Sequence, residues 1–290
     1  MKFVHTFCST PLLKGKFNRY IIQLPIIITD YTYSATCLKK LGQTIELYAD
    51  QTGADILSHI PYDKVHIIEH NDNAHFAASI KFKALEDMQL GDVLIDGDLF
   101  IQQNESIDLI KEYNKQYDFV YSFFEPVEYT VKDQQSVNVY NKLLSKMNIA
   151  NDKFIEPYTQ PEMYEDLTWP NTSLMVFNNQ HLKDEYIRQY YYHKDALENI
   201  DFGTSWPDII IEQYHMKKLL NHYGFSSKAM IENFPTSTAN NYALDIGYTH
   251  LGNGKETLNN MFMCELYDLD QDMFYKMIDA IHYYLKNKPK

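Results

Sequence analysis

Hydrophobic and polar positions follow two patterns in the first hundred residues, one typical of strands and one typical of helices. Short, mostly apolar runs predict β-strands in KFVHTF from Lys2, TIELYAD from Thr44 and YDKVHII from Tyr62. A fourth run, DVLID from Asp92, is nearly continuous and is typical of a strand covered on both faces of a parallel sheet. Residues 74–88 have helical spacing instead. This order of elements predicts an α/β fold rather than an all-α or sandwich fold.

The segment between the first two strands is predicted to be a long loop followed by one short helix. Ser34 is a candidate N-cap for this helix, which contains Cys37, Leu38 and Leu41. Gly42 follows the last apolar position and is expected to end the helix.

The second half of the chain continues the alternation of strands and helices. Strands are predicted in YDFVYSFF from Tyr117 and in SLMVFNN from Ser173. Helices are predicted in HLKDEYIRQYYYH from His181, PDIIIEQYHMKKLLNHYG from Pro207 and the amphipathic stretch from about Gln271. No linker, low-complexity tract or internal repeat divides the 290 residues, so we expect residues 1–290 to form a single domain.

Composition and charge narrow the possible functions. The formal net charge is -13, with 39 acidic against 26 basic residues, which argues against a nucleic-acid partner. The apolar stretch IIQLPIIIT from Ile21 contains Gln23 and Pro25 and is shorter than the roughly 20 residues that a membrane span needs. The first residues lack a continuous signal core, and three widely spaced cysteines suit reduced thiols. We therefore expect a cytoplasmic protein without a transmembrane segment.

Two carboxylates interrupt the apolar run VLIDGDLFI. Asp96 and Asp98 follow a buried-looking strand, and ligands of open α/β sheets bind at the carboxyl ends of such strands. If the chain is extended here, alternate residues project to one side, and two carboxylate oxygens suit Mg²⁺ or Mn²⁺. Gly97 between them would leave room for a ligand. An ordinary solvated turn is the alternative interpretation.

The chain contains a second group of alternating acids that serves as a comparison. Asp268, Asp270 and Asp272 precede the last predicted helix. Acids at a helix start accept hydrogen bonds from free N–H groups and complement the helix dipole, so helix capping is sufficient to explain them.

The motifs in order resemble those of the GT-A glycosyltransferases that use nucleotide-sugar donors, especially the glycogenin-like and capsular polysaccharide types. VHTF is similar to the first strand of that family, KFKAL to the basic segment before its metal motif, and VLIDGDLFI to the strand that ends in its Asp-x-Asp. PNTSLMVFNN from Pro170 is similar to its Asn-x-Gly strand, and THLGNGK from Thr249 to its C-terminal His-and-Lys loop. The resemblance implies a GT-A-like fold with a mixed, mostly parallel sheet flanked by helices.

The resemblance also assigns roles to individual residues. It implies a Mn²⁺ or Mg²⁺ site formed by Asp96, Asp98 and His250. It implies that the donor is bound by Thr6, Phe7, Lys81, Asp96, Gly97, Asn171, Ser173 and Lys255. A segment at helical spacing could reach the sugar or the acceptor, as the Asp-Gln segments of related enzymes do; its candidate catalytic residues are Asp208, Glu212 and Gln213. Asn171 as a turn residue and Asp208 as a first-turn helix acid are the structural alternatives.

This chain departs from the family pattern at two places. Its loop is one residue shorter than the glycogenin-like His-x-x-Gly-x-x-Lys, which bears on Lys255, and Ser173 stands where the family usually has Gly. The expected activity is transfer of a sugar from a UDP- or GDP-sugar to a carbohydrate or lipid-linked glycan acceptor, as in polysaccharide biosynthesis, with retained configuration. The alternative is a catalytically silent nucleotide- or carbohydrate-binding protein of the same fold. A nucleotidyltransferase or a dinucleotide-dependent oxidoreductase is disfavoured because the required Gly-rich loops are missing.

Overall fold

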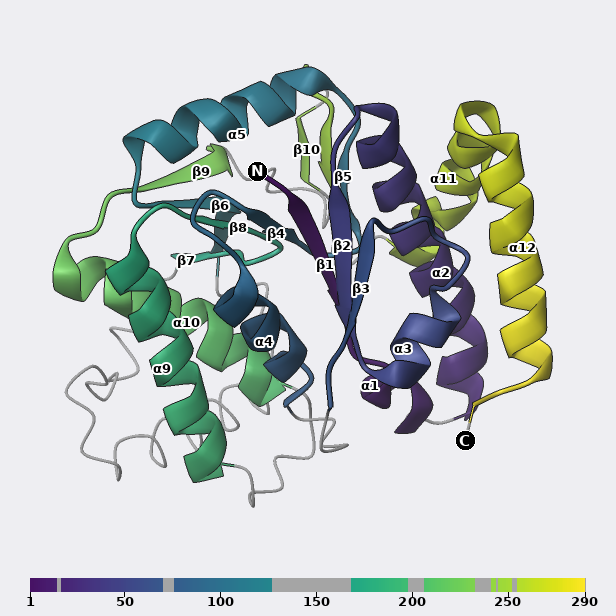
Figure 1. Ribbon diagram of the computed structural model, residues 1–290, viewed down its shortest axis with the longest axis horizontal. Helices are drawn as coiled ribbons and strands as arrows, with labels where there is room; N and C mark the ends of the chain where they lie inside the picture. Colours follow the sequence, from purple (N-terminus) through teal and green to yellow (C-terminus); the bar gives the residue numbers. More distant parts are fainter. Residues whose placement is uncertain are drawn as a thin grey trace.

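A computed structural model describes residues 1–14, 17–69, 76–126, 168–197, 206–232, 241–243, 245–251 and 255–289. It has a central β-sheet with helices on both faces (Figure 1). The strands of the main sheet are β1 (Phe3–Phe7), β2 (Ile45–Ala49), β3 (Lys64–Ile67), β4 (Val93–Ile95), β6 (Phe119–Pro126), β7 (Thr168–Pro170), β8 (Leu174–Phe177) and β9 (Ser227–Ile231).

The main sheet is mixed and mostly parallel. Its order is β3-β2-β1-β4-β8-β6-β7, with β9 also paired to β6. The first four strands are parallel, as are β6 and β9, whereas β8 runs antiparallel between β4 and β6 and β7 runs antiparallel to β6. This arrangement confirms the predicted fold class.

A smaller antiparallel sheet lies beside the main one. It has the order β10-β11-β5 and consists of β5 (Leu99–Ile101), β10 (Asn241–Ala243) and β11 (Tyr248–His250). The chain passes from the main sheet at β4 to the small sheet at β5 through only three residues, 96–98. The predicted Asp-x-Asp segment is therefore the connection between the two sheets.

The helices cover the sheet in two groups with separate apolar cores. The described helices are α1 (Thr10–Lys14), α2 (Phe17–Lys40), α3 (Gln51–Ile56), α4 (Ser79–Asp87), α5 (Asn104–Gln116), α9 (Gln180–Leu197), α10 (Trp206–Tyr223), α11 (Lys255–Leu269) and α12 (Gln271–Lys286). One core packs α2, α11 and α12 against the sheet, and the other packs α4, α9 and α10 against the opposite face (Figure 1).

The predicted loop before Ser34 is wrong, because helix α2 extends from Phe17 to Lys40. The apolar residues of this helix are distributed around much of its circumference, and burial between the sheet and the C-terminal helices hides the amphipathic period. Pro25 lies inside the helix, where it removes one backbone hydrogen bond that packing offsets. Ser34 lies in the helix interior and donates to the Leu99 carbonyl at 2.7 Å, so it is not an N-cap. The helix does end before Gly42, as predicted, and Gly42 has a φ of 70°.

The remaining predicted elements are confirmed with small shifts of their bounds. The helix predicted for residues 74–88 is α4, which begins at Ser79; residues 70–75 lie outside the described part of the chain. Helix α12 begins where predicted, and Asp270 is its N-cap, accepting from the Met273 N–H at 3.1 Å. The sequence analysis missed α1, α3, α5, α11 and the short strands β5, β7, β9, β10 and β11. Across the described residues, no helix has the length and apolar character needed to cross a membrane. That residues 1–290 form one domain stays a prediction.

Candidate functional site

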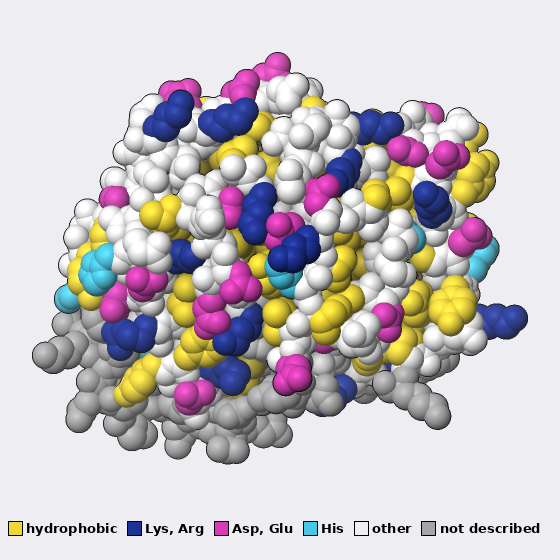
Figure 2. Space-filling model, viewed as in Figure 1, with side chains coloured by type: hydrophobic (Ala, Val, Ile, Leu, Met, Phe, Trp, Pro, Cys, Tyr) yellow, Lys and Arg dark blue, Asp and Glu magenta, His cyan; other side chains and the backbone are white. Residues whose placement is uncertain are grey.

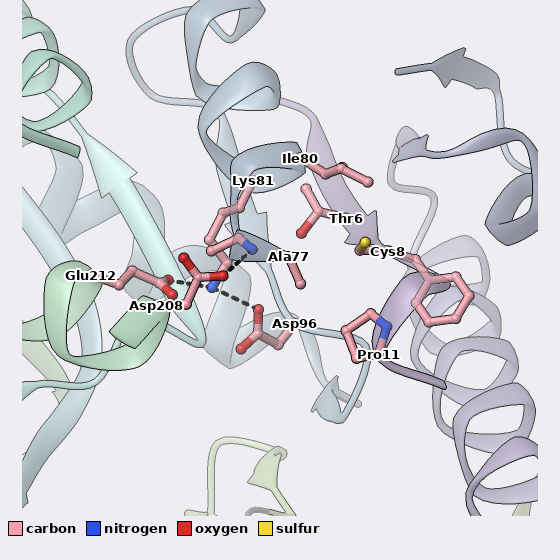
Figure 3. A pocket seen from close by; sticks show the side chains of 11 residues that line it. Thr6, Cys8, Pro11, Ala77, Ile80, Lys81, Asp96, Asp208 and Glu212 are labelled. Carbon is pink, nitrogen blue, oxygen red and sulfur yellow. Dashed lines mark hydrogen bonds and ion pairs between the residues drawn. The ribbon is translucent and has the colours of Figure 1, made fainter. Parts of the chain in front are cut away.

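A cavity of about 290 Å³ opens at the carboxyl ends of β1 and β4, which are parallel neighbours. This is the edge of an open α/β sheet where ligands bind. Figure 3 shows residues from β1, α4, the β4–β5 connection and α10 converging on it. Predicted site residues among its lining are Thr6, Phe7, Lys81, Asp96, Asp208 and Glu212.

Lys81 is the centre of a charged cluster in this cavity. Its ammonium group lies 2.5 Å from Glu212 Oε1 and 3.1 Å from Asp96 Oδ1, and it also donates to the Thr172 carbonyl at 3.3 Å. Burial lowers the pKa of Lys81, but the two carboxylates outweigh that effect and leave the pKa above its ordinary value. Lys81 therefore stays charged and joins α4, α10 and the β4–β5 connection (Figure 3).

Asp208 and Glu212 lie four residues apart on α10, so both face the cavity from one side of the helix. Asp208 accepts from the Ala78 N–H at 2.6 Å and from the Tyr190 hydroxyl at 3.1 Å. Burial raises the pKa of Asp208 to about 8, and burial also raises the pKa of Glu212, against the opposing effect of Lys81. Asp208 is thus a largely protonated carboxyl group near neutral pH.

The Asp96-Gly97-Asp98 segment is a turn and not an extended strand. The Leu99 N–H donates to the Asp96 carbonyl at 3.1 Å, which closes the turn, and the Asp96 N–H donates to the Ser173 carbonyl at 2.8 Å. The alternation expected for an extended chain does not apply here. Asp96 instead pairs with Lys81 and keeps 36% of its side chain exposed, whereas the Asp98 side chain is 10% exposed and faces His250.

Gly97 has a packing reason for lacking a side chain. A Cβ atom at this position would lie 2.3 Å from the ring of Tyr31, which packs over the turn from α2. The Tyr31 hydroxyl donates to the Thr6 carbonyl at 2.5 Å, which fixes the ring between the ends of β1 and β4. The space that the sequence analysis reserved for a ligand beside Gly97 is occupied by Tyr31 on this side.

A buried chain of hydrogen bonds holds the backbone that follows the turn. Ser34 donates to the Leu99 carbonyl, so its oxygen accepts from His5 Nε2 at 3.1 Å, and His5 Nδ1 then accepts from the Tyr62 hydroxyl at 3.0 Å. Burial lowers the pKa of His5 to about 3, so the imidazole is neutral and can hold this single tautomer. The backbone after Asp98 is therefore held by α2 and β1 together.

Asp98 and His250 are brought together by the small sheet. Pairing of β11 with β5 places His250 opposite Leu99, and the Leu251 N–H donates to the Asp98 carbonyl at 3.1 Å. His250 Nε2 then lies 3.6 Å from Asp98 Oδ2, a distance too long for a hydrogen bond. His250 Nδ1 is buried and has no hydrogen-bond partner within the described part of the chain.

The connection between β7 and β8 lies against the same turn. Asn171 Oδ1 accepts from the Ser173 N–H at 3.0 Å, so Asn171 shapes a turn after Pro170. The carbonyls of Thr172 and Ser173 accept from Lys81 and from the Asp96 N–H. The Ser173 hydroxyl is buried and, among the residues described, has no hydrogen-bond partner. Asn171 and Ser173 thus border the charged cluster without lining the cavity itself.

Gln213 and Lys255 are further predicted residues that the described contacts do not bring to the cavity. Gln213 is buried on α10 next to Glu212, but it does not line the cavity. Lys255 is the first residue of α11, and both its side chain and the preceding residues 252–254 lie outside the description.

A divalent cation fits part of the predicted ligand set. No group of three or more His, Cys, Asp or Glu residues that could hold a metal ion is found among the described residues. Asp98 and His250 nevertheless face each other at a separation too long for a direct hydrogen bond. The carboxylate oxygens of this pair suit Mn²⁺ or Mg²⁺ well, and the imidazole nitrogen suits these cations less well. Asp96, the third predicted ligand, is paired with Lys81.

Several residues that line the cavity or support it were missed by sequence reasoning. Tyr31 holds the turn but lies in the segment predicted to be a loop, and Tyr190 holds Asp208 from α9. Cys8 lines the cavity, and burial raises its pKa to about 12. None of these residues has a sequence pattern of its own, since each is placed by packing between elements far apart in the chain.

Comparisons with known proteins add little to this geometry. No protein-family model matches the chain, and no curated protein matches it. The crystal structure of mouse xyloside xylosyltransferase 1 in its apo form is similar to this chain with a TM-score of 0.31 and 14% sequence identity, over 98% of this chain and 82% of that one. A TM-score of this size does not establish a common fold, so the proposals below rest on the residues of this chain.

Proposed function

We propose that this protein is a metal-dependent glycosyltransferase that moves a sugar from a UDP- or GDP-sugar to a hydroxyl of a carbohydrate or lipid-linked glycan, with retention of configuration. The observation that carries the proposal is the position of the cavity at the carboxyl edge of β1 and β4. There Lys81, Asp96 and Glu212 form one charged cluster beside the Asp98 and His250 pair. The motif resemblance supports the chemistry of the proposal, and the geometry of the charged cluster supports its location.

Asp98 and His250 would hold Mn²⁺ or Mg²⁺, and Asp96 would contact either the cation or the donor ribose. When bound, the cation would offset the negative charge that develops on the departing diphosphate. The backbone of the turn is held on three sides, by Ser173, by the Ser34 and His5 chain and by Leu251, so the Asp98 carboxylate is pre-positioned.

The other cavity residues would bind and orient the donor and the acceptor. Thr6 and Phe7 at the end of β1 would contact the nucleoside, with Gly97, Asn171 and Ser173 at the border of the sugar site and Lys255 near the diphosphate. Asp208 and Glu212 would accept hydrogen bonds from sugar hydroxyls. The protonated state of Asp208 near neutral pH makes it a donor as well as an acceptor.

The first test is binding measured by thermal shift. Nucleoside diphosphates are added to the protein with and without Mn²⁺, because a ligand that binds the native state raises the apparent melting temperature. We expect a rise that requires both a nucleotide and the cation. The absence of any cation-dependent shift with every nucleotide tested would contradict the proposal.

The second test is turnover of the donor. Release of UDP or GDP from nucleotide sugars is measured for the wild type and for Asp98→Asn, which keeps the shape of the side chain but removes its charge. We expect a loss of about a hundredfold, the scale of removing one transition-state electrostatic contact. Asp272→Asn, an exposed acid in the first turn of α12, is the matched control and should keep full activity. A wild type that binds nucleotide but releases none with any acceptor would be a silent binding protein.

A further inference from the structure

Lys81 and Asp96 form an ion pair that differs from the surface pairs of this protein. On the face in Figure 2, Lys and Arg side chains lie at the surface, interspersed with Asp and Glu. Lys83 and Glu86 of the same helix α4 form such a surface pair at 2.8 Å, with 48% and 36% of their side chains exposed. The side chain of Lys81 is only 9% exposed, and it pairs with two carboxylates. Burial makes each of these contacts stronger than a surface contact.

The three N–H donors of the Lys81 ammonium group all have acceptors. These are Glu212 Oε1 at 2.5 Å, Asp96 Oδ1 at 3.1 Å and the buried Thr172 carbonyl at 3.3 Å. The side chain of Glu212 is 8% exposed, whereas that of Asp96 is 36% exposed and lines the cavity (Figure 3). A ligand in the cavity can therefore reach Lys81 most readily by replacing Asp96.

Asp96 can change its partner through rotation of its side chain, because its backbone is held on both sides. Its N–H donates to the Ser173 carbonyl at 2.8 Å, and its own carbonyl accepts from the Leu99 N–H at 3.1 Å. The carboxylate is the part of this residue that is free to turn.

The pair with Lys81 has a consequence for the predicted cation site. Asp98 and His250 face each other at 3.6 Å, but Asp96 does not complete a set of three with them. Among the described residues, no three His, Cys, Asp or Glu side chains lie close enough together to hold a metal ion. The third predicted ligand is instead held by a lysine, which is a cation itself and repels a divalent cation nearby.

We propose that Asp96 exchanges Lys81 for the cation when the donor binds, so that Lys81 controls the cation site. Without a donor, Asp96 stays on Lys81, and only Asp98 and His250 are available as ligands. A diphosphate oxygen of the donor takes the place of Asp96 on Lys81 and offsets the charge of the lysine. The Asp96 carboxylate then turns to join the other two ligands.

This exchange rests on the proposed function and adds to it a coupling between the two ligands of the site. The donor strengthens cation binding because it releases Asp96. By linkage, the cation strengthens donor binding by the same factor. The protein therefore binds the cation weakly until a nucleotide sugar is present.

The test is Mn²⁺ binding to the full-length protein without nucleotide, measured from the electron paramagnetic resonance signal of free Mn²⁺. The variant Lys81→Met with Glu212→Gln leaves the net charge unchanged and leaves Asp96 without its lysine. Replacing both members of a buried ion pair is often neutral for stability, and all variants are measured well below their melting temperatures. We expect this double variant to bind Mn²⁺ about tenfold more tightly than the wild type, the scale of a typical coupling between sites.

Two further variants test whether Asp96 is the group that is released. Adding Asp96→Asn to the double variant should return the Mn²⁺ affinity to the wild-type level or below. Glu212→Gln alone leaves Lys81 with Asp96 as its one carboxylate partner in the cluster and should weaken Mn²⁺ binding. The matched control is Lys83→Met with Glu86→Gln, which removes the exposed pair of α4 and should bind Mn²⁺ as the wild type does.

A second measurement separates the exchange from general damage to the site. The double variant should bind UDP and GDP less tightly than the wild type in the presence of Mn²⁺, because it lacks the lysine that meets the diphosphate. Tighter Mn²⁺ binding together with weaker nucleotide binding supports the exchange, since damage would weaken both. Equal Mn²⁺ affinity in the wild type and the double variant would overturn it. So would a gain that persists with Asp96→Asn or that appears in the α4 control.

The proposed glycosyl transfer fails by a different result. That result is the absence of a cation-dependent thermal shift of the wild type with every nucleotide. If the wild type shows this shift and the double variant binds Mn²⁺ no more tightly, the exchange alone is wrong.

Discussion

Two segments of this protein share an Asp-x-Asp pattern and differ in everything that surrounds it. Asp96 and Asp98 connect two sheets, and their side chains meet Lys81 and His250. Asp268 lies in the last turn of α11, Asp270 lies between α11 and α12, and Asp272 lies in the first turn of α12. Asp270 caps α12 and pairs with Lys40 at 3.3 Å across a partly exposed surface. The first segment lies at a cavity on the carboxyl edge of the main sheet, and the second serves the start of a helix.

The difference shows that the pattern itself does not define a site. Both segments have carboxylates at alternate positions, but only the carboxylates of the first segment lie against nearly buried charged or polar partners, Lys81 and His250. Asp98 and Lys81 are nearly buried, whereas Lys40 keeps half of its side chain exposed. Electrostatic effects on stability should therefore be large in the first segment and small in the second.

The largest expected difference in unfolding free energy is between substitutions of Lys81 and Lys40, the lysines that pair with the two segments. Lys81→Met removes the charge that holds Asp96 and Glu212, and an uncompensated buried charge costs about 3–5 kcal/mol of unfolding free energy. Lys40→Met, the matched change beside Asp270, should cost less than about 1 kcal/mol. Urea unfolding of both variants measures this difference. Adding Glu212→Gln to Lys81→Met should restore part of the loss; equal costs at the two lysines would contradict the comparison.

The next largest difference in unfolding free energy is expected between substitutions of Gly97 and Gln271, the residues between the alternating acids of each segment. Gly97→Ala places a methyl group against the Tyr31 ring and should cost about 1–3 kcal/mol, because the ring is fixed by its bond to Thr6. Gln271→Ala changes an exposed position at the start of α12 and should leave the unfolding free energy unchanged within about 0.5 kcal/mol. Both values come from the same unfolding experiment. A Gly97→Ala protein as stable as the wild type would show that Tyr31 can move away.

The cavity beside the first segment and the second segment should also differ in the sign of their pH dependence. Burial raises the folded pKa of Asp208 to about 8. Its contribution to the free energy of unfolding is therefore fully present below its unfolded pKa and is lost as the pH rises from there through 8. Asp270 has a lowered pKa, chiefly because it accepts from Met273 N–H, so its contribution is lost as the pH falls below the ordinary Asp range.

Unfolding free energies measured between about pH 5 and 8 should therefore decrease with pH, by on the order of 1 kcal/mol per pH unit, because Asp208 is protonated in the folded state and ionised in the unfolded state over this range. Asp208→Asn mimics the protonated carboxyl and can keep the bonds to Ala78 and Tyr190, so it should flatten this slope. An unchanged slope in Asp208→Asn would assign the effect to other groups.

The smallest expected effect is loss of the helix cap. Asp270→Ala removes the acceptor for the Met273 N–H and should cost about 1 kcal/mol of unfolding free energy, with no change in nucleotide-sugar turnover. Asp270→Asn should keep most of the stability, because Asn also caps helices. A loss of turnover in either variant, at full folding, would assign this segment to a site.

Much of the fold was predictable because it rests on local patterns. The runs that became β1, β2, β4 and β8 are short and apolar, and the last helix has a clear amphipathic face. Lys81, before the predicted strand, and Asp96, after it, were identified from these positions and from the motif order. Their approach within 3.1 Å follows from the parallel sheet and its covering helix.

What could not be predicted depends on packing between distant elements. Helix α2 is buried on several sides, so its apolar residues show no clear helical period. The position of Tyr31 beside the turn could therefore not be predicted. For the same reason, the packing that requires Gly at position 97 could not be predicted. The register that places His250 opposite Leu99 requires β5 to join β11, about 150 residues later in the chain, and strands of three residues leave no pattern.

The three-residue connection between β4 and β5 has a consequence for the tolerance of this region to insertions. Its length sets the register of β5 against β11, and a shift by one residue would turn every β5 side chain to the other face of the small sheet. An inserted residue would thus separate Asp98 from His250 and would also turn Leu99 and Ile101, now fully buried, toward the face where the equally buried Phe100 is packed. Loop length is usually the most variable property of a fold, and here it is expected to be among the least.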